Sequence, residues 1–139
     1  MSDRTVRKNL KNYTTTIKVE KTIMEIQTLL VAKGAQKIMT EYENGVAVGL
    51  TFLLNSPKGQ IPVQLPARIE KVRKIVGVER YAENADKIAW RNIKDWVDAQ
   101  IALIETEMVT VHEVFLPYMI MGEQTLFEKF ADGKLLNSA

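Results

Sequence analysis

Apolar residues recur at helical spacing early in the chain. Four of them, from Val19 to Leu30, are separated by four, three and four residues, which places them on one face of a helix. This pattern predicts a helix over 19–33. Gly34 should end it, because a glycine after the last turn readily adopts a left-handed conformation.

After this helix the residue pattern becomes typical of strands. The runs 36–43 and 46–54 flank Asn44-Gly45, the residue pair that best fits the tight type I′ turn of a β-hairpin. The second run is apolar on both of its faces, which indicates a central strand. A third arm, 60–66, contains two prolines. Because proline donates no backbone hydrogen bond, this arm should lie at the edge of the sheet.

The flanking segments complete the predicted fold. Residues 13–17 are rich in β-branched types and predict a short first strand. A helix should follow the third arm and end at Gly77, and a short terminal helix should cover 124–131. The expected class is α+β, an antiparallel sheet of β-α-β-β-β order packed on helices. The polar residues 1–11 predict a flexible basic arm ahead of one domain over 12–139.

The longest periodic segment runs from 80 to 116. It contains no glycine or proline, and Pro117 follows it, so it predicts one helix of about 37 residues and roughly 55 Å. A compact domain of this size has a radius of gyration near 14 Å. Such a helix would extend beyond its own domain, and its apolar surface would need a second partner.

The second half of this helix is apolar on more than one face. Methionines and aromatic residues on such a surface suit subunit contacts, which predicts a homo-oligomer. The alternative is an internal hairpin with the last helix. The predicted interface residues are Leu103, Ile104, Met108, Val111, Phe115 and Tyr118.

Composition excludes several classes of site. The 139 residues include no cysteine, which rules out disulfides and thiolate sites and fits the reducing cytoplasm. No apolar run is long enough to predict a signal peptide or a membrane span. His112 is the only histidine, and together with Glu105 it makes a weak metal site. We therefore expect no metal, no cofactor and no catalytic residues, although a cleft assembled between subunits leaves an enzyme as an alternative.

The charges are segregated along the chain. Up to Lys94 there are 17 Lys and Arg against 9 Asp and Glu, whereas from Asp95 onward there are 2 against 8. This asymmetry indicates an anion site on the first part or complementary contacts between subunits. A solvated dipolar surface without function is the alternative.

Cations and aromatic residues are interleaved within the basic part. Phosphates pair with cations and bases stack on aromatic rings, so this mixture predicts a site for a nucleotide or a nucleic acid. The predicted ligand-binding residues are Arg68, Lys71, Arg73, Lys74, Arg80, Tyr81, Lys87, Trp90, Arg91 and Lys94. Alternatively, the tryptophans pack in the core and the cations form ion pairs. Arg91, between two tryptophans, should have an internal partner such as Glu79 or Asp95.

Parts of the chain resemble small uncharacterised proteins encoded by bacteriophages and prophages. The resemblance lies in AWRNIKDWVDAQ at 89–100 and EVFLPY at 113–118, and extends to TTTI at 14–17 and IPVQLP at 61–66. It implies a phage context in the host cytoplasm. Small phage accessory proteins commonly bind nucleic acid or nucleotides, including the signalling nucleotides of host defence, or block a host protein.

Two functions follow from these observations. The first is a non-enzymatic, homo-oligomeric protein that binds a nucleic acid or a nucleotide through the basic face of residues 68–94. The alternative is an inhibitor that binds a host protein through the acidic and apolar surface of residues 95–128.

Overall fold

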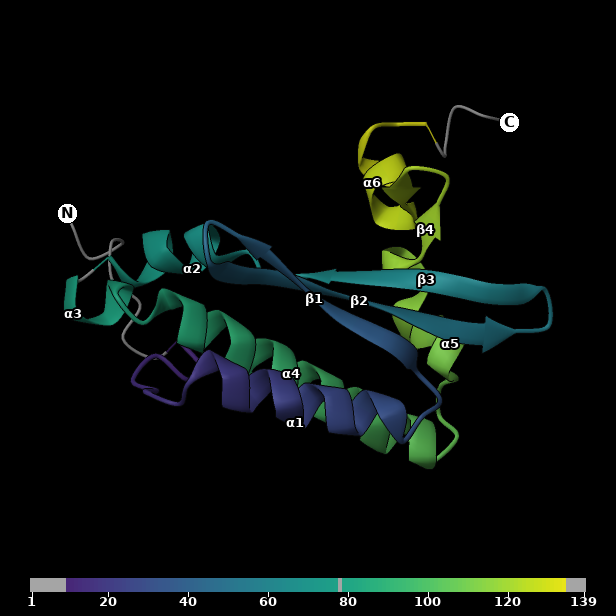
Figure 1. The fold of residues 1–139 in the computed structure, drawn as a ribbon, viewed down its shortest axis with the longest axis horizontal. Coiled ribbons are helices and arrows are strands. Elements are labelled where there is room, and N and C mark those ends of the chain that lie inside the picture. Colours follow the sequence, from purple (N-terminus) through teal and green to yellow (C-terminus); the bar gives the residue numbers. More distant parts are fainter. Residues whose placement is uncertain (1–9, 78, 135–139) are drawn as a thin grey trace.

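The structure is a computed structural model that describes residues 10–77 and 79–134, and for Glu79 and Arg80 only the backbone. A three-stranded antiparallel sheet lies over a layer of two long helices (Figure 1). The expected α+β class is confirmed. The predicted arm at 1–11 lies almost wholly outside the described residues.

The sheet consists of β1 (Gln36–Glu43), β2 (Val46–Ser56) and β3 (Gly59–Pro66), in the order β1-β2-β3. The central place of β2 and the edge place of β3 are as predicted. The first hairpin closes through Asn44 and Gly45, whose φ angles are 51° and 79°. Both are positive, as a type I′ turn requires.

The prolines of β3 occupy positions whose backbone groups point away from β2, along the outer edge of the sheet. Ser56 pairs with Gly59 around a two-residue turn, and the register then continues to Gly49 and Pro66. Because hydrogen-bonded and non-bonded pairs alternate, every second residue after Gly59 turns its backbone groups outward. These residues are Gln60, Pro62, Gln64 and Pro66. Two of the four lack an N–H, so the edge offers few donors to an incoming strand.

The helical layer contains α1 (Val19–Val31) and α4 (Ala85–Glu105), which lie side by side and run in the same direction (Figure 1). Helix α1 begins where predicted and ends at Val31, two residues before the predicted end. Gly34, which follows, has a φ of 95°. Ion pairs join the two helices, with Arg91 Nη1 2.6 Å from Glu25 Oε1 and Lys33 Nζ 3.2 Å from Glu105 Oε2.

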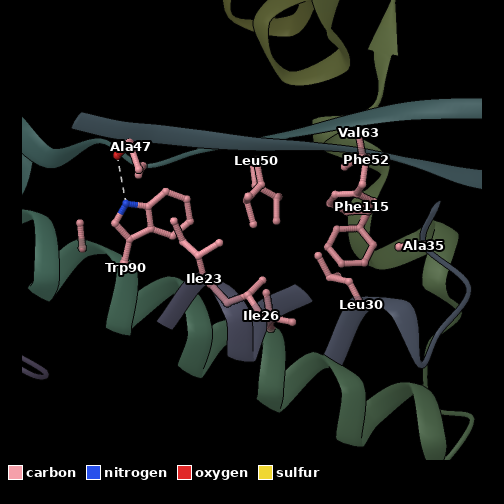
Figure 2. Close-up of a cluster of buried hydrophobic side chains, with 14 of the residues drawn as sticks. Ile23, Ile26, Leu30, Ala35, Ala47, Leu50, Phe52, Val63, Trp90 and Phe115 are labelled. Atoms are coloured by element: carbon pink, nitrogen blue, oxygen red, sulfur yellow. Dashed lines mark hydrogen bonds between the residues drawn. The ribbon is translucent and has the colours of Figure 1, made fainter. Parts of the chain in front are cut away.

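The core lies between these two layers. Its largest fully buried side chains are those of Trp90, Phe52 and Phe115. Trp90 lies beneath the sheet and donates a 3.0 Å hydrogen bond from Nε1 to the carbonyl oxygen of Ala47 (Figure 2). The apolar stripe of α1 faces the same space, and Ile26 is 0% exposed. The pattern that predicted α1 therefore also identified its buried face.

Shorter elements lie at the two ends of this core. At one end, α2 (Ile69–Val76) and α3 (Glu79–Ala82) follow β3. The other end is residues 111–134, here termed the C-terminal module. Its elements are α5 (Val111–Phe115), a 3₁₀ turn (Leu116–Tyr118), β4 (Ile120–Met121), β5 (Gln124–Thr125) and α6 (Leu126–Ala131). The module crosses the β3 edge, so that α6 lies on the side of the sheet opposite α1 and α4 (Figure 1).

The prediction of one unbroken helix over 80–116 is wrong. Helix α4 has 21 residues and is about 31 Å long. After it, Glu107 has a φ of 62°, and Thr110 begins α5 through a capping box with Glu113. The break returns Phe115 to the core, where its ring centroid lies 5.4 Å from that of Phe52. The overhang expected from an unbroken helix is therefore absent, so the length of the helix no longer favours a second subunit.

The predicted first strand at 13–17 is also wrong. Residues 11–14 form a turn, in which Asn12 has a φ of 66°, and residues 15–18 belong to no strand. The Asn12 side chain donates to Asn92 and Asp95 on α4 instead. Among the described residues the main sheet therefore has three strands. The small β4–β5 pair was not predicted, and α6 begins two residues after the expected start of the terminal helix.

Candidate functional site

The structure divides the predicted basic cluster between separate surfaces. Arg68, Lys71 and Lys74 are exposed around α2, and none of the three pairs with an acidic residue of the described chain. Arg73, on the same helix, is ion-paired with Glu70. Among the predicted ligand-binding cations whose side chains the structure describes, the three around α2 are therefore exposed and without an ion pair.

The cations of α4 have internal partners. Arg91, whose side chain is 14% exposed, donates to Glu25 at 2.6 Å and to Thr22 at 3.1 Å. Its expected internal partner is therefore found, but Asp95 is the wrong one because α1 covers this face of α4. Two further lysines bond within α4 or to its N-cap residue: Lys94 Nζ lies 3.6 Å from Asp98 Oδ2, and Lys87 Nζ lies 3.0 Å from Asn84 Oδ1.

The aromatic residues of the predicted cluster face inward or contact each other. Trp90 is 0% exposed, so it packs in the core and cannot stack on a ligand. Tyr81 packs edge-to-face on Tyr13, with ring centroids 5.3 Å apart. The side chain of Arg80 lies outside the described residues.

A cleft of about 250 Å³ opens between the end of β3 and α4. We term it the β3–α4 cleft. Trp96 forms its aromatic wall with Tyr118, and their ring centroids are 6.0 Å apart at 74°. Its lining residues are Leu65, Pro66, Arg68, Asn92, Ile93, Trp96 and Tyr118. A cationic residue, an amide and two aromatic rings therefore meet in one opening.

Arg68 also lines a second cleft on the other side of the β3–α2 connection. This cleft measures about 470 Å³ and includes Lys71 and Arg73 as well as Glu43 and Glu70. Arg68 thus stands between an aromatic opening and a more charged one. Its guanidinium offers several donors in a planar fork that suits a phosphate or a carboxylate.

Backbone contacts hold Arg68 in this place. The N–H of Ala67 donates to the carbonyl of Val48 at 2.8 Å, which ties the residue before Arg68 to the central strand. Gly49 allows the strands to approach closely here, because an added Cβ would lie 2.9 Å from Glu41 Oε1 and 3.1 Å from the carbonyl oxygen of Leu65. The position of Arg68 is therefore set by the end of the sheet.

The turn at residues 11–14 orients Asn92 in the β3–α4 cleft. Asn12 Nδ2 donates to Asn92 Oδ1 at 2.8 Å and to Asp95 Oδ2 at 2.8 Å, and Lys11 Nζ lies 3.4 Å from Asp95 Oδ2. Since Oδ1 of Asn92 already accepts a hydrogen bond, Nδ2 is the remaining donor of this cleft-lining side chain. Within the described chain, that nitrogen has no hydrogen-bond acceptor.

The same contacts perturb Asp95. Partial burial by itself would raise the pKa of its carboxyl, but the hydrogen bond from Asn12 and the charges of Lys11 and Lys94 outweigh it, and the pKa lies below its usual value. Asp95 therefore stays ionised and keeps Asn12 in place to orient Asn92.

Asn92 was not predicted to bind a ligand. Trp96 lies among the aromatic residues of the basic part but is not in the predicted ligand-binding set, and Tyr118 was assigned to an interface. One signal was available, because Trp90 and Trp96 are six residues apart, which separates them by about 120° around a helix. If one tryptophan is buried under the sheet, the other must face a different direction. Only the packing decided that it faces the cleft.

The predicted interface residues do not form one free surface. Phe115 is 1% exposed and belongs to the core, so it is not available to a second subunit. Met108 is 71% exposed. The other four are half-buried: Leu103, Ile104, Val111 and Tyr118. Phe115 packs on Phe52 and Trp96 rather than on the last helix, and the homo-oligomer stays a prediction.

The residues considered for metal binding have other contacts. His112 Nε2 lies 2.8 Å from the carbonyl oxygen of Asn55, and Glu105 pairs with Lys33. Over residues 10–77 and 79–134, no group of three or more His, Asp or Glu side chains is arranged to hold a metal ion. In the same residues no helix is both long and apolar enough to cross a membrane.

Comparison with known proteins adds no relative to this picture. No family model, no curated protein and no solved structure matches the chain. The resemblance to phage proteins remains an expectation from the sequence. Arg68 and its surroundings are therefore the basis for assigning a function.

Proposed function

We propose that this protein binds a phosphate-bearing ligand, a nucleotide or an exposed base of a single-stranded nucleic acid, at the Arg68 corner. The corner comprises Arg68, Lys71, Asn92, Trp96 and Tyr118. One observation carries the proposal: Arg68 is exposed and has no acidic partner among the described residues, yet it lines both the aromatic β3–α4 cleft and the charged cleft beside it.

Each part of the corner matches one part of such a ligand. Trp96 and Tyr118 offer aromatic surface to a planar base, and the unbonded Nδ2 of Asn92 can donate to an acceptor on the base edge. Arg68 can bind a phosphate through two parallel hydrogen bonds. Lys71 and Lys74 add positive charge nearby, which favours the approach of an anion.

The size of the site limits the ligand. A cleft of about 250 Å³ is near the lower end of the range for small-molecule sites, so it suits one base with its phosphates placed toward α2. In the expected phage setting, a signalling nucleotide of host defence belongs to this class. A homo-oligomeric state and a location in the host cytoplasm remain predictions.

Binding can be measured through tryptophan fluorescence, because Trp96 lines the cleft whereas Trp90 is fully buried. We would titrate ATP, GTP and a short oligo(dT), and repeat each titration by calorimetry. Binding should quench Trp96, and the affinity should fall by about an order of magnitude between about 50 and about 200 mM salt because several phosphate contacts release counterions.

Two variants give the test its specificity. Arg68→Ala should lower the affinity about tenfold or more, and Lys58→Ala, which removes an exposed lysine from the β2–β3 turn, should leave it unchanged. Equal losses in both variants, salt-independent affinity, or no binding of any of the three ligands would contradict the proposal.

A further inference from the structure

The C-terminal module carries an apolar groove that shares no lining residue with the two clefts beside Arg68. The groove measures about 280 Å³, and its lining contains no polar residue: Leu116, Pro117, Leu126, Phe127 and Phe130. Phe127 is 45% exposed and Phe130 is 49% exposed. Large apolar side chains gathered at one exposed place are typical of binding surfaces.

The groove is held in shape by the module itself. A capping box joins Thr125 and Glu128 at the start of α6, and Gln124 Nε2 donates to Asp132 Oδ2 at 2.6 Å, near the end of this helix. The N–H of Leu126 donates to the carbonyl of Met119 at 2.9 Å. Met119 is buried and forms a bridge with Val63 of β3. The exposed phenylalanines therefore belong to a fixed surface rather than a frayed helix end.

The charge around this groove indicates its partner. No lysine or arginine occurs between Asp95 and Glu128. The module carries four exposed carboxylates, Glu113, Glu123, Glu128 and Asp132, against two lysines, Lys129 and Lys134. The grooves of two copies placed face to face would bring like charges together, which opposes that pairing. The partner should instead present cations beside apolar side chains.

We propose that the groove binds an amphipathic, basic helix of another protein. Phe127 and Phe130 are one turn apart on α6, with ring centroids at 6.4 Å. This spacing suits a helix that places apolar anchors at i and i+3 or i+4. Lysines or arginines next to those anchors would suit the excess of exposed carboxylates over lysines in the module. A helix of this kind would be the binding element of the host protein in the alternative function predicted from the sequence.

The test uses the whole protein and three labelled synthetic peptides in fluorescence anisotropy. The first is a short Leu/Lys helix with apolar residues on one face, the second has the same composition in scrambled order, and the third replaces lysine by glutamate. The first peptide should bind at least about tenfold more tightly than either of the others, because it alone combines an apolar face with cations.

Variants of the protein locate the binding site. Phe127→Ala and Phe130→Ala should each weaken binding of the Leu/Lys peptide about tenfold, with thermal unfolding showing that the fold is kept. Met24→Ala is the matched control, because it removes an apolar side chain that is 68% exposed on α1, and it should have no effect. Arg68→Ala should also leave peptide binding unchanged, which separates this inference from the proposed nucleotide site.

Several outcomes would overturn the inference. These are equal binding of the scrambled peptide, no binding of the Leu/Lys peptide, or equal weakening by Met24→Ala and Phe127→Ala. Sedimentation of the free protein provides a further check. A dimer that dissociates in Phe127→Ala would make a second copy the occupant of the groove and would also overturn it.

Discussion

The body of this protein, residues 10–105, and α6 of its C-terminal module differ in how far they bury their largest aromatic side chains. In the body, Phe52 and Trp90 are 0% exposed between the sheet and the helices, whereas in the module Phe127 and Phe130 are about half exposed. The difference follows from the length of the elements. Helix α4 has 21 residues and meets both α1 and the sheet, but α6 has 6, and its two phenylalanines stay exposed within the described chain.

The module depends on the body for its own packing. It inserts Phe115 between Phe52 and Trp96, with ring centroids 5.4 and 5.9 Å away, and fastens to the sheet through His112 and Asn55. Short helices are marginal without such tertiary contacts. We therefore expect a substitution in the body to affect the whole molecule and one at the Phe115 anchor to affect mainly the module.

The largest effect should come from Trp90→Ala in the body. It removes a fully buried side chain and its hydrogen bond to Ala47, and should lower the free energy of unfolding by about 3–5 kcal/mol. Urea denaturation followed by circular dichroism measures this. Trp90→Phe keeps most of the packing and should lower the free energy of unfolding clearly less than Trp90→Ala does. A loss below about 1 kcal/mol for Trp90→Ala would mean that the body does not depend on this side chain.

Phe115→Ala should destabilise the C-terminal module more than the body. It removes the buried anchor of the module and should cost about 3 kcal/mol, with amide hydrogen exchange accelerated over 119–131 before it changes in α1 and α4. Leu116→Ala is the matched control, because Leu116 is the next residue and is 44% exposed. Uniform acceleration of exchange throughout the protein would show that module and body unfold as one unit.

Asp95 tests how the turn at 11–14 is attached to the body. The pKa of Asp95 is lowered in the folded protein. The ionised carboxylate therefore adds to the free energy of unfolding above the unfolded pKa, and this stabilisation is lost as pH falls through the folded pKa. Asp95→Asn should therefore cost about 0.5–1 kcal/mol near neutral pH and flatten the stability profile at acidic pH. Combining it with Asn12→Ala should add little, since both remove the same contact. Additive losses would place the effect elsewhere.

The smallest effect on stability should come from Phe127→Ala in the module. Its side chain is 45% exposed, so the free energy of unfolding should change by no more than about 0.5 kcal/mol, although peptide binding should fall. Thermal unfolding compared with Phe115→Ala measures the contrast. A loss as large as that of Phe115→Ala would mean that the groove is part of the core of the module.

Much of the fold could be predicted from the sequence because its signals are local. Helix α1, the hairpin around Asn44-Gly45, the central β2, the edge strand β3 and the end of α2 at Gly77 were predicted nearly to the residue. The break after α4 was missed although Thr110 and Glu113 have the spacing of a capping box. The absence of glycine and proline was given more weight than this signal.

The candidate site was predicted only in part. Arg68, Lys71 and Lys74 are exposed as a binding role requires. Arg91 and Lys94 fit the same pattern of charges but are neutralised by Glu25 and Asp98. A pattern of charges cannot distinguish these cases, because the acidic partner of Arg91 lies 66 residues away in sequence. Trp90 was assigned to the site and Trp96 was not, since sequence alone does not say which face of α4 the sheet covers.

The sequence by itself determined the conformations that a few adjacent residues control: the turn at Asn44-Gly45, the helix ends at Gly34 and Gly77, and the outward prolines of β3. It also determined the separation of basic and acidic halves. Only the tertiary structure decided where α4 ends, what Arg91 bonds and which aromatic residues remain accessible. These depend on which side chains of the opposite layer lie against each face. The burial of Phe115 and the capping box at Thr110 and Glu113 together favour a break over a longer continuous helix.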